Sequence, residues 1–422
     1  MVINKIKYFL IFFISFFLIF INPILPQKKD SCVDCHSQLE RNLSLPVKEM
    51  EADIHRERGF SCFTCHGGDP ALDDESSMDE KKGFLGKLNK KKILSLCSGC
   101  HSNPDFMKKF NPSLRVDQAE LYASSQHGKL LASDDDKVAV CSDCHKPHGI
   151  LPSNNPKSSI FPVNVPETCG ICHSNSKYME EYKIPVDQLD TFRKSVHGVA
   201  LFEKRDLGAP ACNDCHGNHG STPPQVTSVA NVCRQCHGSA GELFSESPHK
   251  KAFDEMGLSE CEACHGNHEI SKPTDEMLGT GEGAVCVKCH EVNSRGYNVA
   301  FKMKQSIDEL KNKERKAKEI LRKAEKAGVE VGEAIFSLND VNTSITKARN
   351  LIHGLDMTRI EETIKDGSAI ADKAYKDGEK AIEEASFRRK GLGVSLIFII
   401  LFIVSLLYKI RQIEKRKIQR GK

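Results

Sequence analysis

The five-residue pattern Cys-x-x-Cys-His occurs nine times in this chain of 422 residues. The nine copies use all 18 cysteines, so none remains for a disulfide, a nucleophile or a separate metal site. A histidine follows every second cysteine, although the whole chain has only 17 histidines. The cysteine pairs of the motifs are Cys32 and Cys35, Cys62 and Cys65, Cys97 and Cys100, Cys141 and Cys144, Cys169 and Cys172, Cys212 and Cys215, Cys233 and Cys236, Cys261 and Cys264, and Cys286 and Cys289.

This spacing is the one that covalent attachment of c-type haem requires. Two thiols one helical turn apart add to the two vinyl groups, and the next histidine becomes the proximal ligand of the iron. Structural zinc and a disulfide framework are the alternatives, but neither needs a histidine after every second cysteine. We therefore expect nine covalently bound haem c groups with these proximal ligands: His36, His66, His101, His145, His173, His216, His237, His265 and His290.

The motifs lie close together between residues 32 and 290. Aromatic residues are 7% of the chain and tryptophan is absent, so the protein alone cannot build an ordinary apolar core around each haem. We expect a mainly α fold with extensive loops, in which residues 30–298 form a haem-packed cytochrome domain.

Eight further histidines lie outside the motifs, and seven of them recur with the motifs; the eighth, His353, lies beyond the haem region at the predicted end of a helix, where it could instead interact with the helix dipole. From residue 125 a unit repeats three times: a Ser-x-His step, an opening motif with a second histidine three residues beyond it, and a plain closing motif. An earlier, diverged copy has His55 before its opening motif and Asp69 in place of the second histidine. Each of the three units from residue 125 brings two haems and two spare imidazoles, whereas the diverged copy brings one spare imidazole. The expected distal ligands are His55, His127, His148, His197, His219, His249, His268 and His353.

Both ends of the sequence carry apolar segments. Two lysines precede the apolar run 8–21, which predicts an export segment over 1–27, either a cleaved signal peptide, which we favour, or a retained anchor. Residues 392–408 contain no charge and predict a transmembrane helix over 391–410. The basic tail 411–422 then lies in the cytoplasm, and the haem domain in the periplasm or otherwise outside the cytoplasm.

Residues 299–388 predict a stalk of two or three antiparallel helices. Apolar positions recur there at steps of three, four and seven residues, as in the seam of packed helices. The seam positions are Met303, Ile307, Leu310, Ala317, Leu321 and Ala324, then Ile335, Leu338, Val341, Ile345, Ala348 and Ile352, then Ile360, Ile364, Ala374, Ala381 and Ala385.

The formal charge of +3 hides an acidic exported part. Residues 30–390 hold 49 Lys and Arg against 56 Asp and Glu, once four basic residues before them and seven basic residues and Glu414 after them are left out. A net charge of −7 makes nucleic acid an unfavourable partner and favours a redox protein with a basic patch.

The motifs, the Ser-x-His-Gly steps ending at Gly128 and Gly198, and the Cys-x-x-Cys-His-x-x-His elements resemble the periplasmic multihaem c-type cytochromes. That superfamily includes tetrahaem carriers, the pentahaem nitrite reductase and the octahaem hydroxylamine oxidoreductase. The resemblance covers residues 30–298 and implies that spare histidines ligate haem irons. Two departures are a count of nine motifs and the lack of Cys-x-x-Cys-Lys, which marks the catalytic haem of many pentahaem nitrite reductases.

Three functions fit these features. The first is a membrane-anchored electron carrier between a membrane partner, quinol-oxidising or of cytochrome b type, and periplasmic electron donors or acceptors. The second is an oxidoreductase acting on a small nitrogen or sulfur compound at an iron without a sixth protein ligand, with Asp69 and His55 as candidate acid–base groups. That iron could instead take a methionine such as Met50 or Met107. The third is a haem-docking subunit of a larger complex.

Overall fold

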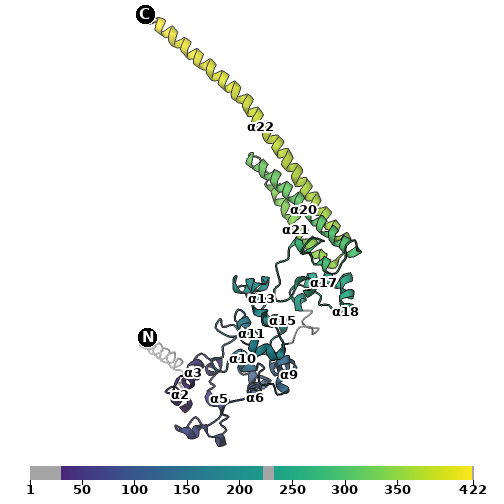
Figure 1. Ribbon diagram of the computed structural model, residues 1–422. Coiled ribbons are helices and arrows are strands. Elements are labelled where there is room, and N and C mark those ends of the chain that lie inside the picture. Colours follow the sequence, from purple (N-terminus) through teal and green to yellow (C-terminus); the bar gives the residue numbers. More distant parts are fainter. Residues whose placement is uncertain (1–29, 222–231, 421–422) are drawn as a thin grey trace, which may run out of the picture. The chain divides into compact units, whose positions relative to one another are not determined.

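The computed structural model describes residues 30–221 and 232–420. The predicted export segment 1–27 and the last two residues lie outside the described residues. The described part contains α-helices, 3-10 turns and long loops, and no strand is found in it (Figure 1). The predicted mainly α fold with extensive loops is confirmed.

The chain forms two compact units. One unit comprises residues 1–190 and 200–223, and the other comprises residues 191–199 and 224–422. The division falls inside the region that the sequence predicts as one haem domain. The last three motifs therefore share a unit with the C-terminal helices.

The helices that carry the motifs are short. Most end at the motif histidine, and their neighbours are brief helices capped by Ser, Asp or Asn side chains. In chain order the α-helices are α2 Ser31–His36, α3 Arg41–Met50, α4 Ile54–Glu57, α5 Cys62–His66, α6 Lys90–His101, α7 Pro104–Met107, α8 Gln118–Ser124, α9 Gln126–Ala132, α10 Cys141–His145, α11 Val165–His173, α12 Ser176–Met179, α13 Gln188–Lys194, α14 Val196–Phe202, α15 Cys212–His216, α17 Gly238–Glu246, α18 Pro248–Met256 and α19 Glu262–His265. The 3-10 helices are η1 Glu75–Met78, η2 Glu80–Lys82, η3 Glu180–Tyr182, η4 Val232–Gln235, η5 Asp275–Met277, η6 Cys286–Lys288 and η7 Ile352–Gly354.

Apolar burial is divided unevenly between the motif region and the C-terminal helices. In the first unit a small cluster gathers Tyr122, Leu131, Val138 and Val140. The larger core belongs to the second unit, where the helices α20 (Arg295–Lys326), α21 (Gly332–Leu351) and α22 (Met357–Arg420) pack together (Figure 1). This distribution agrees with the expectation that bound haem supplies much of the apolar volume between the motifs.

The three-helix bundle follows the predicted seam. All six predicted positions of α20 and all five of α22 are buried. Of the six positions predicted for the second helix, Ile335, in the first turn of α21, is 39% exposed, and Ile352, which lies in η7, is only partly buried. The amphipathic pattern alone was sufficient to place this bundle because its contacts repeat every three or four residues.

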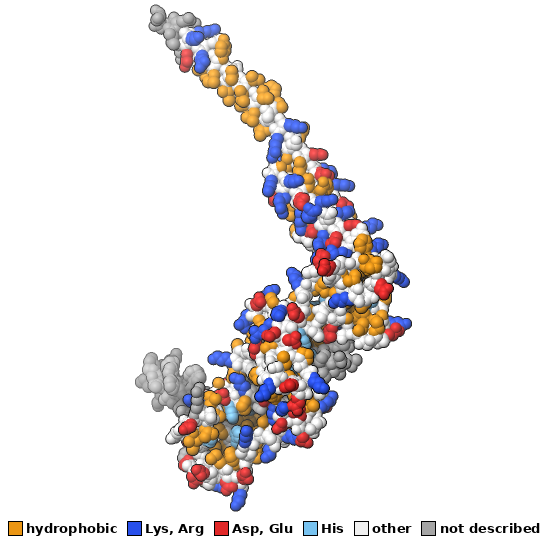
Figure 2. Space-filling model, viewed as in Figure 1, with side chains coloured by type: hydrophobic (Ala, Val, Ile, Leu, Met, Phe, Trp, Pro, Cys, Tyr) orange, Lys and Arg blue, Asp and Glu red, His pale blue; other side chains and the backbone are white. Residues whose placement is uncertain are grey.

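Helix α22 continues past the bundle without a break into the apolar segment 392–408. Figure 2 shows this segment as a band of hydrophobic side chains along a single helix. Phe398 and Phe402 are 68% and 66% exposed. Among the described residues α22 is the one helix that is long and apolar enough to cross a membrane.

Candidate haem-binding sites

Each opening motif forms one turn of helix followed by an abrupt change of chain direction. The turn places both cysteines and the histidine next to each other on a short element. The residue after the histidine has positive φ in all four cases, namely Gly67, Lys146, Gly217 and Gly266. Asp143 and Asp214 fix two of these turns, because their carboxylates accept hydrogen bonds of 2.8 Å from the amides of Val140 and Ala211.

Seven motif histidines lie opposite a histidine from outside the motifs. The ring centroids of each pair are 5.8 to 6.2 Å apart. The pairs are His101 with His55, His66 with His148, His173 with His127, His145 with His219, His237 with His197, His290 with His249, and His265 with His353.

This separation fits one metal atom between two imidazoles. A metal–nitrogen bond to histidine is about 2 Å, so rings that bind opposite sides of one atom have centroids roughly 6 Å apart. No group of three or more His, Cys, Asp or Glu side chains that could hold a metal ion occurs among the described residues. A pair of imidazoles suits an iron whose other four ligands come from a porphyrin.

Two of the non-motif imidazoles are held at Nδ1, which leaves Nε2 as the ring nitrogen available to a metal. Nδ1 of His55 lies 3.0 Å from Oδ1 of Asp53, and Nδ1 of His353 lies 2.9 Å from the carbonyl oxygen of Asn350. Second-shell bonds of this kind set the tautomer and orientation of metal-binding histidines. Both side chains thus offer the nitrogen that an axial ligand needs.

Asp53 is 1% exposed, and both of its carboxylate oxygens accept hydrogen bonds. Burial alone would raise its pKa, but hydrogen bonds from the His55 side chain and from the amides of Ile150 and His55 outweigh burial and lower the pKa. The Ile150 amide donates to Oδ2 at 2.8 Å. A charged carboxylate therefore fixes His55 and ties its helix to the loop that follows His148.

Burial lowers the pKa of several of the paired imidazoles. Burial lowers the pKa of His66, His101 and His127, with a smaller contribution from the neighbouring imidazole. For His145, burial and then His219 lower the pKa to about 4. Only a neutral imidazole has the lone pair that binds iron.

The Ser-x-His-Gly step has a simple structural basis. Oγ of Ser125 accepts a hydrogen bond from the amide of Gly128 at 3.0 Å and so caps α9. A Cβ atom at Gly128 would lie 1.9 Å from the carbonyl oxygen of Tyr122. Ser195 and Gly198 repeat both features. The serine begins the helix, the glycine allows close approach to the preceding helix, and the histidine between them is held in place.

The pairs follow two rules. A histidine of a Ser-x-His step, or His55 in the first copy, pairs with the closing motif of its own unit, as His127 does with His173. The histidine three residues beyond an opening motif pairs instead with the opening motif of the preceding unit, as His148 does with His66. His353 provides this second kind of partner for the last opening motif.

Motifs of successive sequence repeats are also neighbours in space, within each compact unit of the fold. Hydrogen bonding between sulfur atoms raises the pKa of Cys97 and lowers that of Cys141 to about 7. The same relation joins Cys169 to Cys212 and Cys261 to Cys233. The closing motif of one unit therefore lies beside the opening motif of the next.

The two acid–base candidates have other partners in the structure. His55 faces His101. Oδ1 of Asp69 accepts a hydrogen bond of 3.1 Å from the amide of Ala71 within its own loop. The sequence interpretation linked the iron without an imidazole to Asp69, but in the structure the histidine three residues beyond an opening motif lies opposite the opening motif of the preceding unit.

One family model matches the chain. Its description is Cytochrome c3, and it matches residues 54–174 and 205–291. These ranges contain eight of the nine motifs and leave out the first, at Cys32. No curated protein matches the chain, and no solved structure does.

Proposed function

The chain belongs to the multihaem c-type cytochromes, and on this premise we propose that it is a membrane-anchored, nine-haem electron-transfer protein. Its partners are a quinol-linked redox protein in the membrane and soluble redox proteins of the periplasm. When bound, haem c supplies reversible one-electron chemistry. The observation that carries the proposal is the set of seven paired imidazoles.

Paired imidazoles favour electron transfer over catalysis. Two histidines complete the coordination of an iron and leave no position for a substrate. Little ligand movement is needed when the charge on such an iron changes, because both rings are held by the protein. Sites of this kind serve to space and tune a cofactor, which is the protein's contribution to electron transfer.

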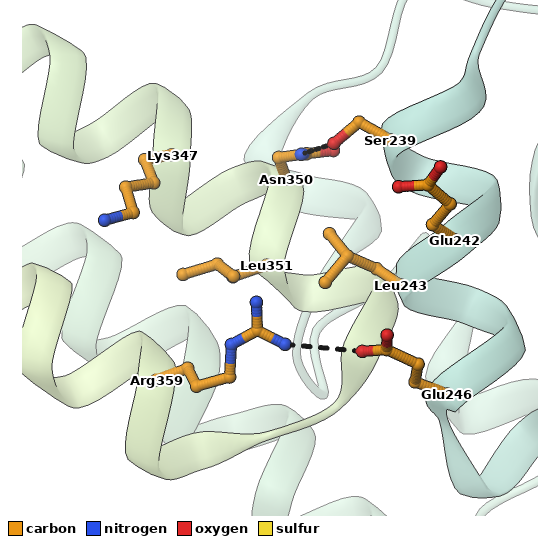
Figure 3. A pocket seen from close by; sticks show the side chains of 8 residues that line it. All are labelled: Ser239, Glu242, Leu243, Glu246, Lys347, Asn350, Leu351 and Arg359. Atoms are coloured by element: carbon orange, nitrogen blue, oxygen red, sulfur yellow. Dashed lines mark hydrogen bonds and ion pairs between the residues drawn. The ribbon is translucent and has the colours of Figure 1, made fainter.

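The contacts of His353 support a connection between the haem sites and the membrane helix. His353 lies in η7, directly before α22. Helix α17 packs on this turn. Figure 3 shows the contacts of α17 with the helices on either side of the turn: Nδ2 of Asn350 in α21 donates to Oγ of Ser239 at 2.6 Å, and Arg359 in α22 pairs with Glu246 at 3.5 Å. The bundle is thereby fixed to the last haem motifs, which suits electron transfer close to a membrane.

The charge of the exported part indicates the kind of soluble partner. Residues 30–390 carry a net charge of −7, and each haem adds two propionates. A partner with a basic patch would be steered toward such a surface, with an association rate that falls as salt is added.

Two measurements on the purified holoprotein test the proposal. A pyridine haemochrome assay with intact mass should give nine haems per chain, and electron paramagnetic resonance should show mostly low-spin ferric haem. Fewer than eight haems, or a spectrum dominated by high-spin iron, would contradict it.

A further inference from the structure

One motif histidine lacks an imidazole partner. All 17 histidines are among the described residues, and seven pairs account for fourteen of them. By position in the sequence, His268 stands to His216 as His219 stands to His145. His36 is then left over.

The local structure shows that the first motif is of the closing type. Helix α2 ends at His36, and Ser37 follows with φ −63°. The closing motifs in α6 and α11 also end in His-Ser, and Ser102 and Ser174 have φ −99° and −100°. The residues after the opening motifs all have positive φ.

The first motif also has the spatial neighbours of a closing motif. Burial and then Asp30 raise the pKa of Cys32 to about 11, and Cys62 adds to the rise because its thiol lies nearby. Helix α2 also contacts α5. The first motif therefore lies beside the second, as every closing motif described above lies beside the next opening motif.

The pairing rules now give a definite result for His36 and Asp69. The eight histidines outside the motifs are matched to eight other motif histidines, so none of them remains for His36. The histidine three residues past an opening motif lies opposite the opening motif of the preceding unit. Asp69, which occupies this position in the first copy, instead accepts a hydrogen bond from the amide of Ala71.

We propose that the haem attached to Cys32 and Cys35 keeps an exchangeable sixth position, which takes a small exogenous lone-pair donor of two or three atoms. This inference rests on the proposed haem attachment and goes beyond electron transfer, because it assigns a ligand-binding site. In the sequence, the site lies at the opposite end of the motif series from the membrane helix.

Carbon monoxide binding to the dithionite-reduced, full-length holoprotein tests the inference by a spectroscopic readout. Native protein should bind one carbon monoxide per chain and show one high-spin ferric haem that cyanide converts to low spin. The double variant C32A/C35A should retain eight haems and bind none. His353→Ala should open a second haem and raise the stoichiometry to two.

Asp69→Asn is the matched control for the neighbouring loop and should leave the stoichiometry at one. If the native protein binds no carbon monoxide and has only low-spin haems, a side chain such as Met50 or Met107 fills the position and the inference fails, while the electron-transfer proposal stands. Binding at three or more haems would instead refute the imidazole pairs and both proposals. If C32A/C35A is not produced, the native stoichiometry and the single high-spin signal still decide the question.

Discussion

At the scale of single residues, the haem sites depend on groups that hold the imidazoles as much as on the imidazoles themselves. Asp53 fixes His55 through Nδ1, and Ser125 and Ser195 begin the helices that carry two other histidines. The cysteine motifs and the Ser-x-His steps could be recognised in the sequence because each depends on short-range spacing. The role of Asp53 could not be recognised in the sequence, because the hydrogen bond that it accepts from the Ile150 amide joins segments far apart in the chain.

Replacing Gly128 with alanine should destabilise the first unit. The new Cβ would lie 1.9 Å from the Tyr122 carbonyl oxygen, so backbone must move, at a cost of about 1–3 kcal/mol. Thermal unfolding should show a lower Tm, and haem content should fall. Gly281→Ala is the control, since nothing lies within 4 Å of its Cβ position, and its Tm should match the native value. Equal Tm values for both variants would remove the steric explanation of the Ser-x-His-Gly step.

Asp275 should stabilise the second unit in a pH-dependent way. Hydrogen bonds from Arg349 are the largest influence and, with Lys311, lower its pKa to about 2 against an opposing effect of burial. A carboxyl group with a lowered folded-state pKa contributes stability above its unfolded pKa of 3.8, and this contribution is lost as the pH falls toward 2.

Asp275→Asn should therefore lower the free energy of unfolding by about 1–2 kcal/mol at pH 6, and the difference should vanish near pH 2. Chemical denaturation followed by circular dichroism at both pH values measures it. Asp372→Asn, which breaks the exposed pair with Lys313, should cost less than about 1 kcal/mol. A difference for Asp275→Asn that does not change with pH would show that lost packing, and not charge, causes it.

At the scale of elements, the bundle contains a turn, between α21 and α22, that places His353 opposite His265, where it is proposed to supply one axial ligand. The seam of α20 could be read from the sequence because each contact repeats along one helix. The position of His353 opposite His265 could not, because 88 residues separate them and no local pattern relates them. The pairing of His148 with the motif of an earlier unit escaped sequence reasoning for the same reason.

Replacing His353 with alanine should change one haem and leave the bundle folded. The iron held by His265 would lose its second imidazole and become high-spin, which electron paramagnetic resonance detects. Lys347→Ala, in the same helical region, is the control and should leave the spectrum unchanged. If His353→Ala also shows no spectral change, the bundle does not supply an axial ligand and serves only as a spacer.

At the scale of the whole molecule, one continuous helix joins the bundle to the apolar segment. Within α22, buried Ala385 belongs to the bundle, and the residues from Leu392 to Tyr408 are exposed. Exposure of so many large apolar side chains to water is costly, at roughly 25 cal/mol for each Å². A lipid bilayer removes this cost, and the basic residues after Tyr408 would then remain on the cytoplasmic side.

This topology predicts the outcome of protease digestion in cells with a permeabilised outer layer. The haem region should be digested, whereas a tag placed after Lys422 should survive, because the positive-inside bias predicts a cytoplasmic location for the basic tail. Truncation after Lys390 should release a haem protein with an intact bundle, since every buried seam residue precedes that position. Digestion of the tag would show that the membrane orientation is the opposite of the predicted one. A truncated protein that stays in the membrane would show that the apolar run 8–21 is a retained anchor and not a cleaved signal peptide.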